Sequence, residues 1–306
     1  MRLRLRDRAL ELEPGRPVLM GVVNATPDSF SDPGRRGLPE LLAAVRAQVR
    51  EGAALIDVGG ESGRTDRRAV SVREEAARVV PLVERLAAAG VLVSVDTWRA
   101  PVARAALQAG AAMINDVSGL VDAAVADACA EAGAALVLTH TRIPPKVKGF
   151  PRYRDVVEDA LALWRARAAE ARRRGVEEDQ LVLDPGIDLA KTPAESVELL
   201  RRLEEQRALG RPLLVAVSRK DFVGALTGRP PSERLAGTLA ALGFAAAAGA
   251  AILRVHDVAA ARDYLRVRAA LHGDAEVPRD LHLDPRLRRQ GPEPEAGSPV
   301  RAVREA

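Results

Sequence analysis

The 306-residue sequence contains few cysteines, lysines and aromatic residues. Its single cysteine, Cys129, excludes an internal disulfide and a cysteine-based metal site, and is typical of a reducing compartment such as the cytoplasm. Four of the 46 basic residues are lysines, which leaves 42 arginines. Because acidic residues are interspersed among them and the net charge is only +4, we expect no nucleic-acid partner.

Long hydrophobic segments are also scarce. Residues 1–12 alternate Arg and Leu and contain no apolar core of the kind that a secretion signal needs. The run from Leu235 to Leu253 carries no charge, but it is mostly Ala and Gly and would insert weakly into a bilayer. Gly249 divides this run, which predicts a buried helix followed by a strand. We therefore expect no membrane partner and a cytoplasmic location.

Short segments rich in Leu and β-branched residues alternate with amphipathic segments. Eight strands are predicted at Val18–Asn24, Leu55–Gly59, Val91–Asp96, Met113–Asp116, Ala135–His140, Leu181–Asp184, Leu213–Ser218 and Ile252–His256. Helical segments are predicted at Leu38–Arg50, Ser71–Ala89, Pro101–Ala109, Ala123–Ala132, Arg154–Arg174, Pro193–Ala208 and Ser232–Ala248. This alternation, without a duplicated dinucleotide-binding half, predicts an α/β fold, a closed (β/α)8 TIM barrel.

The two ends of the chain differ from this pattern. Residues 1–13 alternate Leu with charged residues, which predicts a β-hairpin that closes the bottom of a barrel formed by residues 14–272. Residues 273–306 form a Pro- and Arg-rich tail. Within it, residues 285–306 have too few apolar groups to become ordered, and we expect them to be disordered.

Polar residues follow all eight predicted strands, and barrel enzymes carry their chemistry at the carboxyl ends of the strands. The polar residues are Asn24, Glu61, Asp96, Asn115 with Asp116, His140, Asp184, Ser218 with Lys220, and Arg254 with His256. A single Asp or Asn at such a position more often caps the next helix. Eight polar strand ends that meet at one mouth predict a ligand site.

The kinds of side chain narrow the ligand. Asp96, Asp184 and Asn115 suit a flat heterocycle with NH donors and a carbonyl. The cationic candidates suit an anion such as phosphate; they are Lys220, Arg254, His256, Arg64 and Arg219. Neither a Gly-x-Gly-x-x-Gly run after a strand nor a Gly-Lys-Ser/Thr loop is found, so dinucleotides and nucleoside triphosphates are disfavoured. The histidines lack the spacing of a zinc site, whereas a hard cation on Asn24 remains open.

Seven motifs carry a family resemblance. They are MGVVNATPDSFSDPG (Met20–Gly34), IDVGGESGR (Ile56–Arg64), SVDT (Ser94–Thr97), INDVSG (Ile114–Gly119), LDPGI (Leu183–Ile187), SRK (Ser218–Lys220) and RVHDV (Arg254–Val258). In their order and spacing over about residues 18–270, they resemble dihydropteroate synthase of folate biosynthesis. That family joins 6-hydroxymethyl-7,8-dihydropterin diphosphate to p-aminobenzoate and releases pyrophosphate.

The resemblance implies a role for each matched residue. The pterin would be bound by Asp96, Asn115, Asp184 and Lys220, and the diphosphate by Asn24, Arg64, Arg254 and His256. Asn24 would also bind Mg²⁺, which neutralises the leaving group. Asp96, Lys220 and Arg254 would be catalytic, and Asp96 would stabilise positive charge at the pterin methylene. The family also implies a homodimer, to which the helix at 235–248 could contribute a surface.

Departures from the family pattern concentrate on the acceptor pocket. Gly63 replaces a Thr, Leu189 replaces the Phe that packs on p-aminobenzoate, and Asp221 follows Ser-Arg-Lys. In the family, the p-aminobenzoate carboxylate lies near the helix that begins there, so Asp221 would oppose it unless it turns away or pairs with an Arg. Pro33 replaces a Gly in the opening loop and should stiffen it. We therefore expect poor sensitivity to sulfonamides, which mimic p-aminobenzoate.

Other interpretations stay open. The chain could be a paralogue with another acceptor or without synthase activity, or a pterin-binding methyl-transfer module that uses methyltetrahydrofolate. The opening motif, which serves a diphosphate, argues against the methyl-transfer module. Asp116 and Asp257 could cap helices, Arg219 could be a salt-bridge partner beneath the site, and Ser62 could serve either purpose.

Overall fold

The computed structural model describes residues 1–13, 15–25, 37–63, 65 and 68–284. A two-stranded antiparallel hairpin, β1 (Arg2–Leu5) and β2 (Arg8–Glu11), precedes the main sheet. Eight parallel strands follow, β3 (Val18–Asn24), β4 (Ala53–Gly59), β5 (Val93–Asp96), β6 (Met113–Asp116), β7 (Ala135–Thr139), β8 (Leu181–Asp184), β9 (Leu214–Val215) and β10 (Ile252–Val255). Met1–Leu265 belong to one compact unit, and the described residues from Arg266 onward belong to a second.

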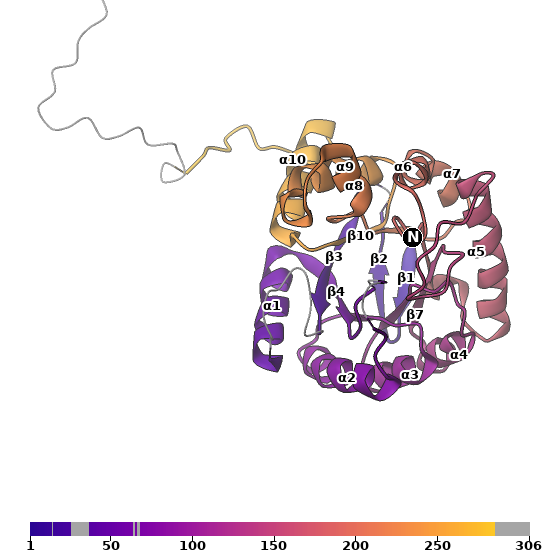
Figure 1. Cartoon of the computed structure of the whole chain (residues 1–306). Helices are drawn as coiled ribbons and strands as arrows, with labels where there is room; N and C mark the ends of the chain where they lie inside the picture. Colours follow the sequence, from indigo (N-terminus) through magenta and orange to yellow (C-terminus); the bar gives the residue numbers. More distant parts are fainter. Residues whose placement is uncertain (14, 26–36, 64, 66–67, 285–306) are drawn as a thin grey trace, which may run out of the picture. The chain divides into compact units, whose positions relative to one another are not determined.

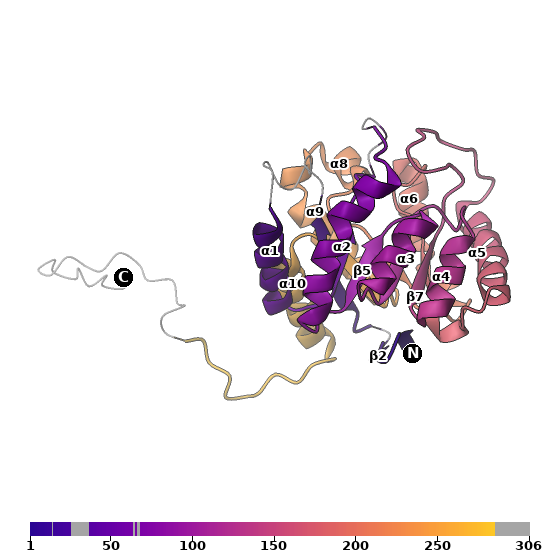
Figure 2. The same cartoon turned by 90° about the horizontal axis from the view of Figure 1, so that it is seen from below.

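Helices follow the strands around the ring in Figure 1, and Figure 2 shows α2 to α5 from below. They are α1 (Leu38–Glu51), α2 (Val72–Ala88), α3 (Ala100–Gln108), α4 (Ala124–Ala132), α5 (Val156–Arg173), α6 (Pro193–Arg201), α7 (Leu203–Arg207), α8 (Asp221–Thr227), α9 (Leu235–Ala247) and α10 (Val258–His272). Two short 3₁₀ helices, η1 (Glu178–Gln180) and η2 (Pro231–Glu233), precede β8 and α9.

The sheet closes into a barrel. Its strand order is β8-β7-β6-β5-β4-β3-β10-β9, with every recorded pairing parallel. A parallel bridge between Leu183 and Leu213 joins the two ends of this order. The predicted TIM barrel is therefore confirmed.

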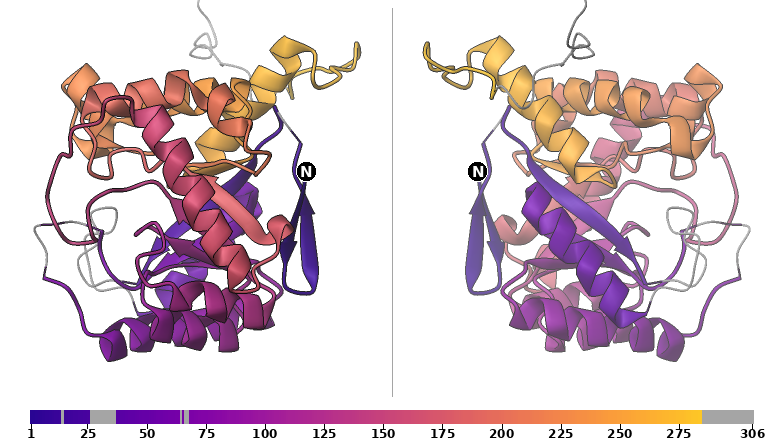
Figure 3. Two further views of the ribbon diagram at one scale, coloured as in Figure 1. Left: turned by 90° about the vertical axis from the view of Figure 1, so that its right-hand side faces the viewer. Right: turned by 90° about the vertical axis from the view of Figure 1, so that its left-hand side faces the viewer.

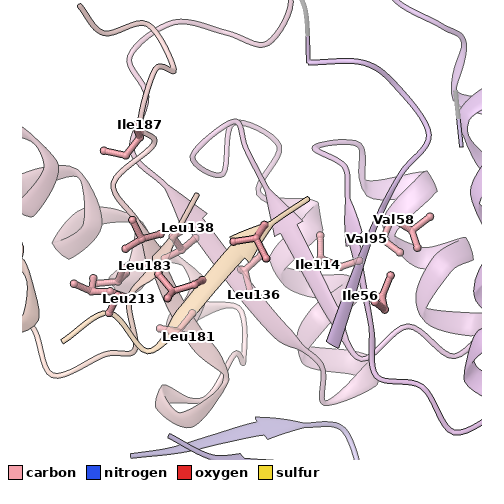
Figure 4. Close-up of a cluster of buried hydrophobic side chains, with 14 of the residues drawn as sticks. Ile56, Val58, Val95, Ile114, Leu136, Leu138, Leu181, Leu183, Ile187 and Leu213 are labelled. Carbon is pink, nitrogen blue, oxygen red and sulfur yellow. The ribbon is translucent and has the colours of Figure 1, made fainter. Parts of the chain in front are cut away.

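The strands divide their side chains between two environments. Because successive residues of a strand point to opposite faces, Ile56 and Val58 lie in the apolar layer that also contains helix residues. Figure 4 shows this layer, including Ile114, Leu136 and Leu183. The residues between them point into the barrel, where the lower positions are apolar and the positions nearer the carboxyl ends are polar.

The hairpin fills the lower end of the barrel. Leu3, Leu5 and Leu12 are almost completely buried and belong to one cluster with Met20 and Leu55 on the strands. The amide of Arg6 donates a hydrogen bond to the Gly133 carbonyl (2.8 Å). Figure 3 shows the hairpin beside the strands, at the end opposite the loops that follow them. The predicted hairpin at the bottom of the barrel is therefore present.

The differences from the predicted elements are local. The segment predicted as a strand at 213–218 forms a strand only over Leu214–Val215, with the single bridge at Leu213 before it. The helix predicted over 193–208 breaks at Arg202, where the buried Gln206 side chain donates to the carbonyls of Leu199 (2.7 Å) and Arg202 (3.2 Å). These bonds compensate for part of the interrupted helical ladder.

The uncharged run at 235–253 folds as predicted. It forms α9, a left-handed residue at Gly249 (φ 86°) and then β10. Within the described residues, no helix has both the length and the apolar character needed to cross a membrane. The predicted disorder of residues 285–306 lies outside the described residues.

Candidate active site

A cavity of about 440 Å³ opens at the carboxyl ends of the barrel strands. Twelve of the candidate residues named from the sequence line it: Asn24, Glu61, Ser62, Gly63, Asp96, Asn115, Asp184, Leu189, Ser218, Lys220, Arg254 and His256. Arg64 and Pro33 lie outside the described residues. Asp221 is not among the described residues that line the cavity.

The register of the sheet explains why residues from distant motifs meet. Asn24 pairs with Gly59, Gly59 with Asp96, and Asp96 with Asn115, across four neighbouring strands. These four positions therefore lie at one level of the barrel. A Cβ atom at Gly59 would stand only 3.2 Å from Asn24 Oδ1, so the glycine leaves room for the polar side chains on either side.

Asp57, which we did not predict, lies two residues before Gly59 on β4, beneath this level. It is completely buried, and its Oδ2 accepts hydrogen bonds from Arg254 Nε (2.7 Å) and Asn115 Nδ2 (3.1 Å). The Arg254 guanidinium also reaches Asp96 at 3.5 Å. Asn115 Oδ1 accepts no hydrogen bond from the described residues, although it is buried. Asp57 thus orients a cation and an amide whose remaining groups face the cavity.

The two carboxyl groups assigned to the pterin have shifted acidities. Burial, followed by the neighbouring charge of Asp57, raises the pKa of Asp96 to about 7. Burial also raises the pKa of Asp184, although the Gly186 amide donates to its Oδ1 at 2.7 Å. Carboxyl groups with raised pKa values in a cavity are typical of functional sites.

His256 corrects one expectation. Its Nδ1 lies 3.0 Å from Ser218 Oγ, and burial, followed by the charge of Arg254, lowers its pKa to about 3. The imidazole is therefore neutral at pH 7. It offers a hydrogen bond to an anion, rather than the positive charge that we expected.

Two of the polar residues predicted at the strand ends, Asp116 and His140, serve the fold. The Asp116 carboxylate accepts hydrogen bonds from the Ser118 and Leu120 amides (2.8 and 3.2 Å), and His140 Nε2 contacts Asp159 at 2.8 Å. Neither Asp116 nor His140 is among the residues that line the cavity. The expectation that all eight strand ends converge on one ligand site is therefore wrong for the end at His140, whereas Asn115 still brings the end of β6 to the cavity.

Asp221 corrects a second expectation. Its side chain is 88% exposed and pairs with Arg234 at 2.9 Å, outside the cavity. Arg219 is likewise used in an ion pair, with Asp257 at 2.7 Å. Asp221 thus turns away from the cavity and pairs with an Arg. In this position it does not oppose an acceptor carboxylate.

The carboxylate at the start of α8 belongs to Asp188 instead. Its oxygens accept hydrogen bonds from the Asp221 and Phe222 amides, and Oδ1 also accepts from Ser196 Oγ at 3.1 Å. Asp188 lines the cavity. Sequence reasoning missed this contact, because it joins the loop after β8 to the first turn of α8, 33 residues further along the chain.

Lys191 holds the loop that carries Asp188. Its ammonium donates to the carbonyls of His140 (2.8 Å), Gly186 (3.0 Å) and Leu189 (3.0 Å), and only 3% of the residue is exposed. Burial lowers its pKa to about 7. Any side chain at Gly186 would clash, because its Cβ would lie 2.2 Å from the His140 carbonyl oxygen. The loop that joins β8 to α6 is therefore closely fixed.

A barrel whose strand ends carry buried carboxyl groups and an arginine around one cavity is typical of an enzyme that binds a polar heterocycle. The family model described as "Pterin binding enzyme" matches residues 20–256. The chain belongs to this family.

Relatives and solved structures agree with this assignment. The dihydropteroate synthase of Mycobacterium leprae is 44% identical over 270 residues, covering 85% of this chain and 95% of the relative. A structure of the Xanthomonas albilineans dihydropteroate synthase with 4-aminobenzoic acid is 42% identical, with a TM-score of 0.82, covering 90% of this chain and 99% of the other. These comparisons confirm the predicted family and the prediction of a transferase of the dihydropteroate synthase type.

One relative shows why individual residues matter. The protein named inactive dihydropteroate synthase 2 of Mycobacterium leprae is 43% identical over 274 residues, covering 85% of this chain and 94% of the relative. Overall sequence identity therefore does not distinguish an active enzyme from an inactive one. The distinction depends on the residues of the cavity.

Proposed function

We propose that this chain joins the methylene group of 6-hydroxymethyl-7,8-dihydropterin diphosphate to an arylamine and releases pyrophosphate. The observation that carries this proposal is the grouping of Asp96, Asn115, Asp184, Lys220 and Arg254 around one cavity. This set combines acceptors for ring NH groups with cations for phosphate oxygens.

The pterin ring would be held by the polar level of the barrel. Asp184 would accept from the 2-amino group and the ring NH, and Lys220 would donate to the ring carbonyl. The buried Oδ1 of Asn115 is a further acceptor for a ring NH. Asp57 would act through others, because it fixes Arg254 and Asn115 by hydrogen bonds.

The diphosphate would be held by the cations and by donors at the last strand. Arg254 and His256 line the cavity, and we assign Arg64 to the same task from its motif. Asn24 offers one amide oxygen, and no group of three His, Cys, Asp or Glu residues able to hold a metal is found among the described residues. Mg²⁺ prefers oxygen ligands and retains waters, so one amide oxygen together with substrate phosphates suits it. When bound, it would neutralise charge on the leaving group.

The reaction breaks one bond and forms one. The bond from the methylene carbon to the diphosphate oxygen breaks, and pyrophosphate leaves with its electron pair. The amine nitrogen forms the new bond to the carbon and loses a proton. Ionised Asp96 would stabilise the positive charge that develops on the pterin methylene. An arylamine is already nucleophilic when neutral, so no strong base is needed.

The test is a pyrophosphate-release assay on the purified full chain with the pterin diphosphate, Mg²⁺ and an arylamine. We expect release that depends on the amine, together with a condensation product of the corresponding mass. Release without an amine-dependent product, or pterin binding without release, would instead support a paralogue that lacks synthase activity.

We further propose a cytoplasmic homodimer. The cytoplasm is suggested by the single Cys129, which is buried. The dimer is implied by the family, and exposed apolar residues on α8 and α9 offer a surface: Leu226 (69% exposed), Leu235 (40%) and Phe244 (50%). Light scattering on the full chain should give twice the monomer mass, and Phe244→Asp should lower it.

A further inference from the structure

Asp188 lines the cavity, and its carboxylate is held in place by hydrogen bonds from neutral groups. Its carboxylate accepts hydrogen bonds from the Ser196 hydroxyl and from the Asp221 and Phe222 amides, with the Phe222 amide 3.3 Å from both oxygens. Among the described residues, no Lys, Arg or His forms an ion pair with Asp188. The hydrogen bonds hold the carboxylate in place without neutralising its charge.

The backbone around Asp188 favours glycine. Asp188 has φ 64° and Ala190 has φ 53°, both in the left-handed region. Asp tolerates this region better than most residues, and its hydrogen bonds offset part of the cost. The same bonds, and the one that Asp188 N donates to Ser196 Oγ (3.2 Å), fix the direction of the side chain. The carboxylate is thus a built feature of the loop.

The neighbouring charges do not compensate for Asp188. Of the described cations that line the cavity, Arg254 pairs with Asp57 at 2.7 Å and Lys146 lies 3.5 Å from Glu61. Lys220 shares the cavity with Asp96 and Asp184, whose carboxyl groups interact with its charge. Apolar residues that line the same cavity include Leu189, Ile143, Pro144, Pro145 and Val147.

We propose that Asp188 determines acceptor specificity, so that this enzyme selects an uncharged arylamine over one that bears a carboxylate. This inference rests on the proposed function, since it concerns the amine that attacks the pterin methylene. A second carboxylate at about 5 Å from Asp188 would be opposed strongly enough to weaken its binding tenfold or more. An apolar wall and a fixed negative charge suit a neutral ring with a hydrogen-bond donor.

The experiment compares p-aminobenzoate with p-aminobenzamide, which differ in charge but hardly in shape. With the wild-type chain, pterin diphosphate and Mg²⁺, we expect kcat/KM to be at least tenfold higher for the amide. Asp188→Asn removes the charge, tolerates the left-handed backbone and still accepts hydrogen bonds. It should raise kcat/KM for p-aminobenzoate at least tenfold and change the value for the amide less than threefold.

The matched control is Asp221→Asn, which removes an exposed charge outside the cavity. It should leave the ratio of the two kcat/KM values within threefold of wild type. A wild-type preference for p-aminobenzoate that Asp188→Asn leaves unchanged or increases would overturn the inference.

A separate readout covers the case in which the proposed function fails. If no variant releases pyrophosphate with either amine, we would measure equilibrium binding of both amines to chains saturated with 6-hydroxymethylpterin and pyrophosphate. Tighter binding of the amide, together with a tenfold gain for p-aminobenzoate in Asp188→Asn, supports the charge selection. Equal affinities in both chains overturn it.

Discussion

The two sides of the cavity are built from different parts of the chain. The side that we propose for the pterin, the pterin side, consists of Asp57, Asp96, Asn115, Asp184 and Arg254, which lie on β4, β5, β6, β8 and β10. The side that we propose for the arylamine, the acceptor side, consists of Gly63, Asp188 and Leu189, which lie in loops after β4 and β8. Strand residues are fixed by the hydrogen-bonded register of the whole barrel, whereas loop residues are fixed by a few local contacts.

This difference has an energetic consequence. The pterin side is one network, in which Asp57 serves both Arg254 and Asn115, and Arg254 also reaches Asp96. A change at one member therefore alters the others. On the acceptor side, Asp188 uses its own set of hydrogen bonds, so its charge can be removed while the network remains. The two sides should respond separately to mutation.

The largest effect that distinguishes the two sides is expected for Asp184→Asn. The amide keeps the shape but loses the charge that strengthens hydrogen bonds from the ring NH groups. We expect kcat/KM for the pterin diphosphate to fall about a hundredfold or more, by the same factor with either amine. Steady-state kinetics measure this, with circular dichroism to check the fold. A loss confined to one amine would contradict the assignment of Asp184 to the pterin.

A second test removes the charge of Asp57, which accepts hydrogen bonds from Arg254 and Asn115. Asp57→Asn leaves the half-buried Arg254 without its closest carboxylate, and removal of one partner of a buried pair costs up to about 3–5 kcal/mol. Urea denaturation should show this loss in the free energy of unfolding. Glu233→Gln, which breaks an exposed pair with Arg229 (2.9 Å), is the control and should cost less than about 1 kcal/mol. Similar losses for the two variants would show that Asp57 does not support the network.

A third test uses the pKa of Asp96, which is about 7. Ionised Asp96 is needed to stabilise the developing cation, so kcat/KM for the pterin diphosphate should rise with pH and level off above about pH 7. At pH 6 it should be roughly a tenth of the plateau value. Asp96→Asn should be slower and should lose this step. A wild-type profile that is flat between pH 6 and 8 would exclude the role.

Stability checks the same group independently. Because folding raises the pKa of Asp96 above its ordinary value of 3.8, the folded state binds a proton between pH 3.8 and about 7 that the unfolded state has released. The stability from that proton is full at low pH and is lost as the pH rises to about 7. The Tm of Asp96→Asn, measured relative to wild type, should therefore be higher at pH 8 than at pH 5.

The smallest effect is expected for sulfonamides, and it sharpens the account of the acceptor side. An N-heteroaryl sulfonamide that is anionic at neutral pH should inhibit about three- to tenfold less well than uncharged sulfanilamide, because Asp188 repels it. Asp188→Asn should reduce this difference in inhibition constants. Equally strong inhibition by both compounds, at the level of ordinary family members, would refute the expected poor sensitivity.

The sequence predicts the barrel well because apolar runs end at polar residues. β3, β6 and β8 have the predicted bounds, and each ends at Asn24, Asp116 or Asp184. Period-two alternation could also have found Asp57, which lies two residues after Leu55 on the inward face of an otherwise apolar strand. The prediction rested on polar residues at the strand ends and just after them, and Asp57 lies two residues before the end of its strand.

The arrangement of the acceptor side could not be predicted from the sequence pattern. α8 has only seven residues, too few for a helical period to stand out. The contact between Asp188 and the first two amides of α8 depends on how the loop after β8 meets the start of that helix in three dimensions. From the sequence, Asp221 therefore looked like the carboxylate that would oppose an acceptor, whereas in the structure it is Asp188 that lines the cavity.

The central claim is that the pterin side and the acceptor side are separable. Calorimetric titration of the dihydropterin diphosphate with Mg²⁺ into wild type, Asp184→Asn and Asp188→Asn tests it most directly. The account predicts that wild type and Asp188→Asn bind with dissociation constants within threefold of each other, while Asp184→Asn binds about a hundredfold more weakly. Equal weakening by both substitutions, or none by Asp184→Asn, would contradict it.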